Sequence, residues 1–128
     1  MLVYFGLKYR ELQQNRMFIE RLVCDFLEIG IEIFCVERDF AKYGSENLLE
    51  QELMKKTFEV ISKSDIVLMD LTEKGVGLGI ECGYAYANNK PIYIIAKKGI
   101  EISKTIMGIA NKIVSYETNI DIVNMFTN

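Results

Sequence analysis

Two hydrophobic patterns alternate along the chain. Short apolar runs rich in β-branched residues, such as 31–36 and 92–96, have the length and composition of buried strands. Between these runs, apolar residues recur every three or four positions among charged ones, which is typical of helices with one buried face. The predicted strands span residues 2–5, 31–36, 65–71, 92–96 and 113–116. The predicted helices span residues 10–29, 45–64 (with Ser45 as N-cap), 80–89, 103–111 and 119–126, and residues 38–44 are predicted to form a polar turn region.

This alternation of strands and helices predicts the fold class. We expect a single α/β domain over residues 1–128, with a flavodoxin-like or Rossmann-like five-stranded, mostly parallel sheet and helices on both faces. A chain of 128 residues suits one domain, and no internal repeat or linker interrupts it. In such sheets, ligands bind outside the carboxyl ends of the strands. Candidate site residues are therefore sought in the loops that follow the strands.

The charge balance and the absence of histidine narrow the possible functions. There are 15 Lys and Arg against 18 Asp and Glu, a net charge of −3, which argues against binding a nucleic-acid backbone. The absence of His removes Ser-His-Asp and Cys-His catalysis and the usual histidine-containing metal sites. We expect no metal and no nucleic-acid partner. Any chemistry must use carboxylates, Tyr, Lys, Cys, backbone amides or a cofactor.

The apolar runs and the cysteines indicate a cytoplasmic protein. The run at residues 92–96 is far shorter than the about 20 residues that span a bilayer, so no membrane association is expected. The apolar start at residues 1–5 is too short for the core of a signal peptide. Cys24, Cys35 and Cys82 are odd in number and form no CxxC pair, and we expect them to be reduced and mostly buried.

A glycine-rich turn after the third predicted strand carries the first candidate catalytic residue. Gly75, Gly77 and Gly79 occupy alternate positions before the predicted helix, in a spacing that matches neither GxGxxG nor GxxxxGK[ST]. Glu81 is expected in the first turn of that helix, whose N-terminus stabilises a carboxylate by about 0.3–1 kcal/mol and keeps it ionised. Such a carboxylate is a candidate nucleophile or base. The alternative is that Glu81 only complements the helix dipole.

Three segments resemble a known enzyme superfamily. Residues 64–72, 77–87 and 89–92 are similar to the nucleoside 2-deoxyribosyltransferase superfamily, and most of all to its 2′-deoxynucleoside 5′-phosphate N-hydrolase branch. The most specific part is the E-x-G-x-A-x-x-x-x-K-P run that begins at Glu81. Residues 3–6 and 103–108 also resemble the first strand and the dimer-contact segment of that branch.

The resemblance implies hydrolysis of the N-glycosidic bond of a (deoxy)ribonucleoside 5′-monophosphate without any cofactor, and a nucleoside is the substrate in the alternative of a deoxyribosyltransferase. It assigns Glu81 as the nucleophile that forms a glycosyl-enzyme ester and Tyr4 as the residue that positions Glu81. Water then releases the sugar in a hydrolase, whereas a second base accepts it in a deoxyribosyltransferase. The resemblance also implies a homodimer.

The resemblance further suggests how a 5′-phosphate would be bound. The loop after the first strand begins at Gly6 and carries Lys8 and Arg10, which could neutralise a phosphate together with the glycine turn at 75–79. Both cations could instead be solvated surface charges. Ser103 aligns with a serine that reaches the phosphate site of the neighbouring subunit.

One position departs from the family pattern. The resemblance places an acid–base Asp about 24 residues before the nucleophile, where this chain has Thr57, and losing such a partner commonly slows a reaction by about 10²–10⁴. The acids near predicted strand ends are Glu37, Asp39 and Asp70. Asp70 is the preferred substitute, and its alternative role is to cap the loop. Thr57 also leaves open a catalytically silent nucleotide-binding module, and a flavin binder would share the same architecture.

Overall fold

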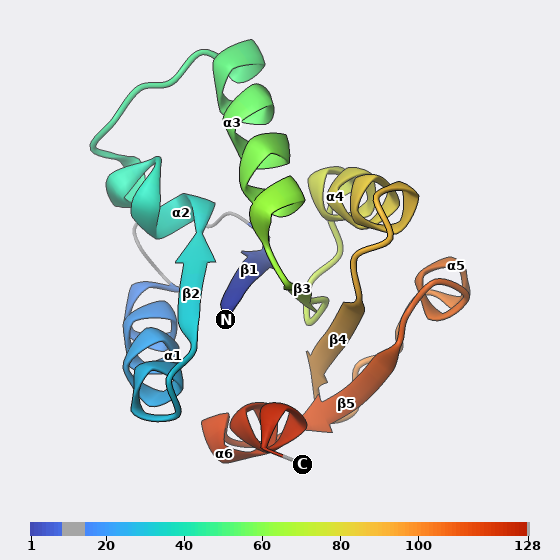
Figure 1. Ribbon diagram of the computed structural model, residues 1–128. Helices are drawn as coiled ribbons and strands as arrows, with labels where there is room; N and C mark the ends of the chain where they lie inside the picture. Colours follow the sequence, from blue (N-terminus) through green and yellow to red (C-terminus); the bar gives the residue numbers. More distant parts are fainter. Residues whose placement is uncertain (9–14, 128) are drawn as a thin grey trace.

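All five strands in the described part of the chain run parallel in one sheet. The computed structural model describes residues 1–8 and 15–127. The strands are β1 (Leu2–Leu7), β2 (Glu32–Cys35), β3 (Ile66–Asp70), β4 (Ile92–Lys97) and β5 (Lys112–Tyr116). Their spatial order is β2-β1-β3-β4-β5 (Figure 1). This is the flavodoxin-like order, so the predicted fold class is confirmed.

Helices cover both faces of this sheet. Figure 1 shows α1 (Arg16–Glu28) and α6 (Asn119–Val123) on one side, and α3 (Glu50–Lys63) and α4 (Val76–Ala87) on the other. Phe26 of α1 and Ile122 of α6 belong to one buried cluster, and Ile61 of α3 and Cys82 of α4 to another. All five residues of β3 are buried, because a strand covered on both faces has no side in contact with water. The α4 side of the sheet is the one that matters for the candidate site.

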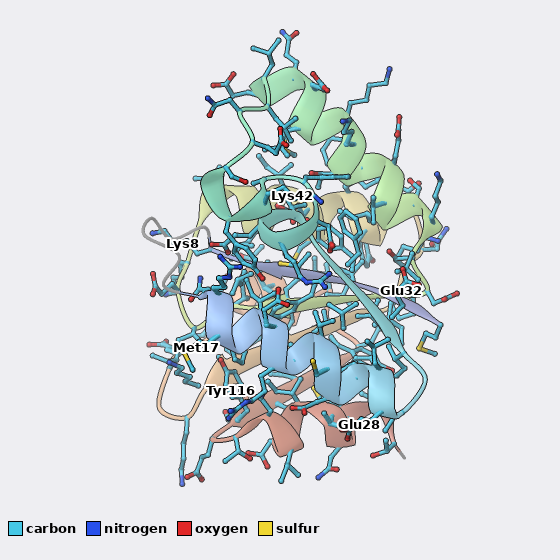
Figure 2. The ribbon with its side chains drawn as sticks, turned by 90° about the vertical axis from the view of Figure 1, so that its left-hand side faces the viewer. Lys8, Met17, Glu28, Glu32, Lys42 and Tyr116 are labelled. Carbon is cyan, nitrogen blue, oxygen red and sulfur yellow. The ribbon has the colours of Figure 1, made fainter. Side chains whose placement is uncertain are left out.

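The strand order creates a crevice beside β1. The chain leaves β1 to form β2 on one side, and later returns to form β3 on the other side. At such a reversal, the connections that follow the adjacent strands β1 and β3 lead to α1 on one face and α4 on the other, which leaves an opening at the carboxyl end of the sheet. In Figure 2, Lys8, which follows β1, lies at the left of the view, and Glu32, which begins β2, lies at the right. The crevice is therefore at the Lys8 end.

Helix α4 begins earlier than the sequence pattern predicts. Its first residue is Val76 and its N-cap is Gly75, whereas the prediction placed the start at residue 80. Leu78, Cys82 and Ala85 are buried at the spacing of one helix face, and this burial outweighs the low helix propensity of the glycines. Glu81 therefore lies in the second turn of α4, and its expected place in the first turn was wrong.

The segment between β2 and α3 also differs from the prediction. Residues 38–44 include part of a short helix, α2 (Val36–Asp39), and a 3-10 turn, η2 (Lys42–Gly44), rather than a plain turn region. Ser45 is not the N-cap of α3: its hydroxyl donates to the carbonyl of Lys42, and α3 begins at Glu50 after Leu49. Serine hydroxyls readily make such local backbone bonds. The consequence is a segment of irregular chain next to the crevice.

The remaining boundaries differ by smaller amounts. Helix α5 (Lys104–Met107) is shorter than predicted, and α6 is followed by a 3-10 turn, η3 (Asn124–Phe126). The predicted start of the first helix at residue 10 lies outside the described residues, and α1 is described from Arg16. Within the described ranges, none of the helices has both the length and the apolar composition needed to cross a bilayer.

Candidate active site

A cavity of about 620 Å³ opens at the carboxyl ends of β1 and β2. Its walls come from the end of β1, the start of α2, the segment 41–48, one side of α3 and the first turns of α4. We call it the main cavity. The residues predicted for the site that line it are Tyr4, Gly6, Lys8, Gly75, Gly77 and Glu81. The topology thus brings together residues that are up to 77 positions apart in the chain.

A hydrogen bond between Tyr4 and Glu81 lies at the floor of the main cavity. Tyr4 is buried in β1 on the face that α3 and α4 cover, and its hydroxyl donates to Glu81 Oε1. A Cβ placed on Gly6 would lie 3.2 Å from Glu81 Oε1 and 2.6 Å from the sulfur of Met69. Only glycine at position 6 leaves room for the carboxylate to lie against the strand. The Glu81 carboxylate is therefore held by the hydrogen bond from Tyr4 and by close packing against Gly6.

Burial raises the pKa of Glu81 above its ordinary value, and the hydrogen bond from Tyr4 opposes that rise. We expected the helix N-terminus to keep this carboxylate ionised, but the dipole acts mainly within the first turn and Glu81 lies in the second. Burial and the neighbouring carboxylate raise the pKa of Tyr4 well above its ordinary value, so Tyr4 remains a hydrogen-bond donor. A partly dehydrated, oriented carboxylate suits attack on carbon.

Cys82 follows Glu81 but takes no part in the cavity lining. It is buried beneath α4, and burial raises the pKa of its thiol to about 12. Cys35 is also buried, with its pKa raised to about 12 by burial, while Cys24 is exposed. The expectation of buried thiols therefore holds for Cys35 and Cys82 and is wrong for Cys24.

Lys8 and the start of α4 form the rim of the main cavity. The stem of the Lys8 side chain runs beside Gly75, because a Cβ placed on Gly75 would lie 3.8 Å from Lys8 Cγ. The first backbone amides of a helix have no partner within the helix, and they attract anions. An exposed lysine and the amides at the start of a twelve-residue helix therefore share one rim. This arrangement can accept an anionic group.

Asp70 does not lie in the main cavity. Its Oδ1 accepts hydrogen bonds from the amide and the hydroxyl of Thr72 at 2.9 and 2.6 Å, and its Oδ2 accepts one from Tyr116 at 2.6 Å. These groups border a second cavity of about 290 Å³. Side chains alternate along a strand, so Met69 faces the main cavity side and Asp70 faces the other. Asp70 therefore lies at the predicted carboxyl end of the sheet, but on the face away from the main cavity for which it was the preferred substitute acid.

Three other predicted residues are outside the main cavity or outside the described chain. Gly79 lies within α4, exposed, and does not line the cavity. Ser103 is the N-cap of α5, where its hydroxyl accepts a bond from the amide of Ile106. Its predicted role concerns a neighbouring subunit and stays a prediction. Arg10 lies outside the described residues.

The main cavity also contains residues that the sequence analysis did not place in the site. The segment 41–48, predicted to include a plain turn, supplies Ala41, Gly44, Glu46, Asn47 and Leu48. Leu53, Met54 and Thr57 enter from α3, and Thr57 is only 2% exposed. Its hydroxyl donates to the carbonyl of Leu53 at 2.8 Å. The spacing to Glu81 did identify Thr57 as a position of interest, whereas nothing in the sequence indicated the segment 41–48.

Glu37 is a buried carboxyl in the wall of the main cavity. It lies in α2, directly after β2, and is 5% exposed. Asp39 of the same helix does not line the cavity; its two carboxylate oxygens accept bonds from the amide of Cys35 and from Arg38. Among the described residues, no group of three or more acidic or sulfur side chains is arranged to hold a metal ion.

Solved structures share this fold, although neither a protein-family model nor a curated protein sequence matches the chain significantly. A CMP N-glycosidase from Clostridium botulinum, BcmB, has a TM-score of 0.70 and 18% identity, covering 99% of this chain and 98% of that one. A 2-deoxyribosyltransferase from Bacillus psychrosaccharolyticus has a TM-score of 0.73 and 18% identity, covering 97% and 91%. BlsM has a TM-score of 0.68 and 20% identity, covering 98% and 93%. These likenesses show a common fold over nearly whole chains.

Proposed function

We propose that this protein cleaves the N-glycosidic bond of nucleosides or nucleotides, and that its preferred reaction is hydrolysis of nucleoside 5′-monophosphates. The observation that carries the proposal is the pairing of Tyr4 with Glu81 on the floor of the main cavity. The E-x-G-x-A-x-x-x-x-K-P run from Glu81 supports it through its resemblance to the nucleoside 2-deoxyribosyltransferase superfamily. The fold shared with a CMP N-glycosidase and a 2-deoxyribosyltransferase is consistent with this assignment.

In the first step, ionised Glu81 attacks C1′ of the sugar. The C1′–N bond breaks, its electron pair leaves with the base, and a glycosyl ester forms on Glu81 through an oxocarbenium-like transition state. The Tyr4 hydroxyl holds Oε1, which fixes the direction of the carboxylate. In the second step, water attacks C1′, Glu81 leaves as a carboxylate, and the sugar phosphate is released; the proton that the water loses balances the proton that the departed base takes up.

The rim of the main cavity is the proposed phosphate site. Lys8 supplies a charge, and the first amides of α4 near Gly75 and Gly77 supply donors. The site would favour a nucleotide over the corresponding nucleoside. Arg10 is also proposed to contribute positive charge to this phosphate site.

We also propose that the protein acts as a homodimer. Met107 of α5 is 49% exposed, and Ile106 beside it is partly buried against the core. A second copy that covers this apolar surface would bring its Ser103 to the neighbouring phosphate site, as the resemblance implies.

Two other functions are each favoured by one observation. A deoxyribosyltransferase would use the same ester on Glu81 and pass the sugar to a second base, and a 2-deoxyribosyltransferase shares the fold. A catalytically silent nucleotide-binding module is favoured by Thr57, whose hydroxyl donates to the helix backbone and is too weak an acid to protonate a base.

A substrate panel tests the proposal. Nucleosides and nucleoside monophosphates are incubated with the protein, and released base is measured by chromatography, with and without a labelled acceptor base. We expect base release from monophosphates, its loss in Glu81→Gln, and its retention in Glu59→Gln, which changes an exposed glutamate of α3. Labelled nucleoside would indicate a transferase. Nucleotide binding without any base release would support the silent module.

A further inference from the structure

We propose that Glu37 is the general acid that protonates the departing base. This inference rests on the proposed glycosidic cleavage. A base that leaves as an anion is a poor leaving group, and proton donation in the transition state commonly accelerates such reactions by about 10²–10⁴. Thr57 lies at the position where the family resemblance expects an acid, and its hydroxyl proton is directed to the carbonyl of Leu53. Another side chain of the main cavity must supply the proton.

Three carboxyl side chains line the main cavity within the described chain, namely Glu37, Glu46 and Glu81. Glu81 is assigned as the nucleophile. Glu46 is exposed to water, whereas Glu37 is 5% exposed. A carboxyl withdrawn from water is the kind that enzymes use as a proton donor near neutral pH. Among the carboxyl groups that line the main cavity, Glu37 is therefore the candidate for the general acid.

The other acids near strand ends are less suitable. Asp70 is buried, but it faces the second cavity and accepts bonds from Thr72 and Tyr116. Asp39 holds the amide of Cys35 and pairs with Arg38, and it does not line the main cavity. Neither side chain reaches the space in which Glu81 would meet a substrate.

Glu37 and Glu81 line the main cavity from elements that follow the two strands flanking β1. Glu37 follows β2, and Glu81 approaches from α4, which follows β3, while β1 lies between these two strands. Neighbouring strands are about 4.8 Å apart, so β2 and β3 are separated by about 10 Å. A sugar ring above the end of β1 would present C1′ to Glu81 and its base toward the Glu37 side.

Glu37 acts as an acid in the first step and as a base in the second. The protonated carboxyl of Glu37 gives its proton to the base as the electrons of the C1′–N bond move onto that base. The resulting Glu37 carboxylate then takes a proton from the water that attacks C1′ of the glycosyl ester. Glu81 leaves as a carboxylate, and Glu37 is again protonated. The net reaction consumes one water and releases base and sugar phosphate.

The test compares Glu37→Gln with Glu59→Gln, which changes an exposed glutamate of α3 outside the cavity lining. Two substrates are used: a nucleoside 5′-monophosphate, and a ribose 5-phosphate carrying 4-nitrophenol at C1′, which departs as a stable anion without a proton. We expect Glu37→Gln to lower kcat on the nucleotide by about 10²–10⁴ and on the nitrophenyl substrate by less than about tenfold. Glu59→Gln should be close to wild type on both. Adding Thr57→Asp to Glu37→Gln should restore part of the nucleotide activity.

Other results would contradict either the role of Glu37 or the proposed function. Equal losses on both substrates would assign Glu37 a structural role, and an unchanged nucleotide rate would also overturn the inference. If Glu37→Gln does not fold, as judged by thermal unfolding, the same comparison is made between Glu37→Asp and Glu37→Asn, of which only the first retains an acid. A wild-type protein that cleaves neither substrate would refute the proposed function itself.

Discussion

The hydroxyl of Tyr4, in the middle of β1, donates a hydrogen bond to Oε1 of Glu81 in the second turn of α4. This bond favours the ionised carboxylate, whereas burial favours the protonated one. The same hydrogen bond thus orients the Glu81 carboxylate and favours its ionised form.

Tyr4→Phe should shift the acid limb of the pH–rate profile to higher pH. The substitution removes the bond that lowers the pKa of Glu81 and leaves the burial that raises it, so this pKa should rise further. The check is kcat/KM against pH for wild type and variant. An acid limb that stays in place, or moves to lower pH, would contradict this role of Tyr4.

Glu81 should make the folded protein less stable as pH rises. Its pKa is raised on folding, so the native state binds more protons than the unfolded state, and the free energy of unfolding falls between pH of about 4.5 and the raised value. Glu81→Gln cannot ionise and lacks this contribution. The stability of the variant relative to wild type should therefore increase across that window in denaturant titrations. A constant difference would show that the carboxylate is not desolvated.

Gly6→Ala should lower both stability and kcat/KM. The added Cβ would lie 2.6 Å from the sulfur of Met69 and 3.2 Å from Glu81 Oε1, so the carboxylate or the methionine must move. We expect a loss of about 1–3 kcal/mol in stability and at least tenfold in kcat/KM. Gly83→Ala is the control, because a Cβ there meets nothing within 4 Å. It should stabilise α4 by about 0.5–1 kcal/mol. Equal activity in both variants would argue against a close fit at Gly6.

Lys8→Gln should weaken binding of nucleotides selectively. Loss of a charged hydrogen bond to phosphate, worth about 1.5–3 kcal/mol, should raise KM for a nucleoside monophosphate about 10–100-fold and leave that for the nucleoside nearly unchanged. Lys55→Gln, at an exposed position of α3, is the matched control for charge. Equal effects on both substrates would remove Lys8 from the phosphate site.

Asp70→Asn should affect stability rather than chemistry. It weakens the bonds that Asp70 accepts from Thr72 and Tyr116, and we expect a cost of about 1–3 kcal/mol in unfolding free energy. Activity of the folded variant should remain within a few fold of wild type. A fall of about 10²–10⁴ in kcat would instead make Asp70 the acid and would contradict the assignment of Glu37.

The sequence was sufficient to predict the fold because the strands are continuous apolar runs and the helices have clear periodicity. It located Tyr4 and Glu81 through their resemblance to a family motif, and the structure shows that they meet. Helix ends were less predictable. Glycine propensity suggested a late start for α4, whereas burial of Leu78 extends it to Val76.

The face of the sheet on which a residue lies was harder to predict from the sequence than the strands and helices themselves. Met69 and Asp70 are adjacent, and only the register of β3 against β1 determines which of them faces Glu81. The segment 41–48 has no hydrophobic period, so its contribution to the cavity depends on contacts between distant parts of the chain. Glu37 belongs to the same category, since nothing in its local sequence indicates that it is buried.

Trapping the glycosyl-enzyme tests the central claim most directly. The protein is mixed with a nucleoside monophosphate, quenched in acid within one turnover, and digested for mass spectrometry. The account predicts a sugar phosphate adduct on the peptide that contains Glu81, formed as base is released and absent in Glu81→Gln. Base release at the wild-type rate by Glu81→Gln, or an adduct on another residue, would contradict it.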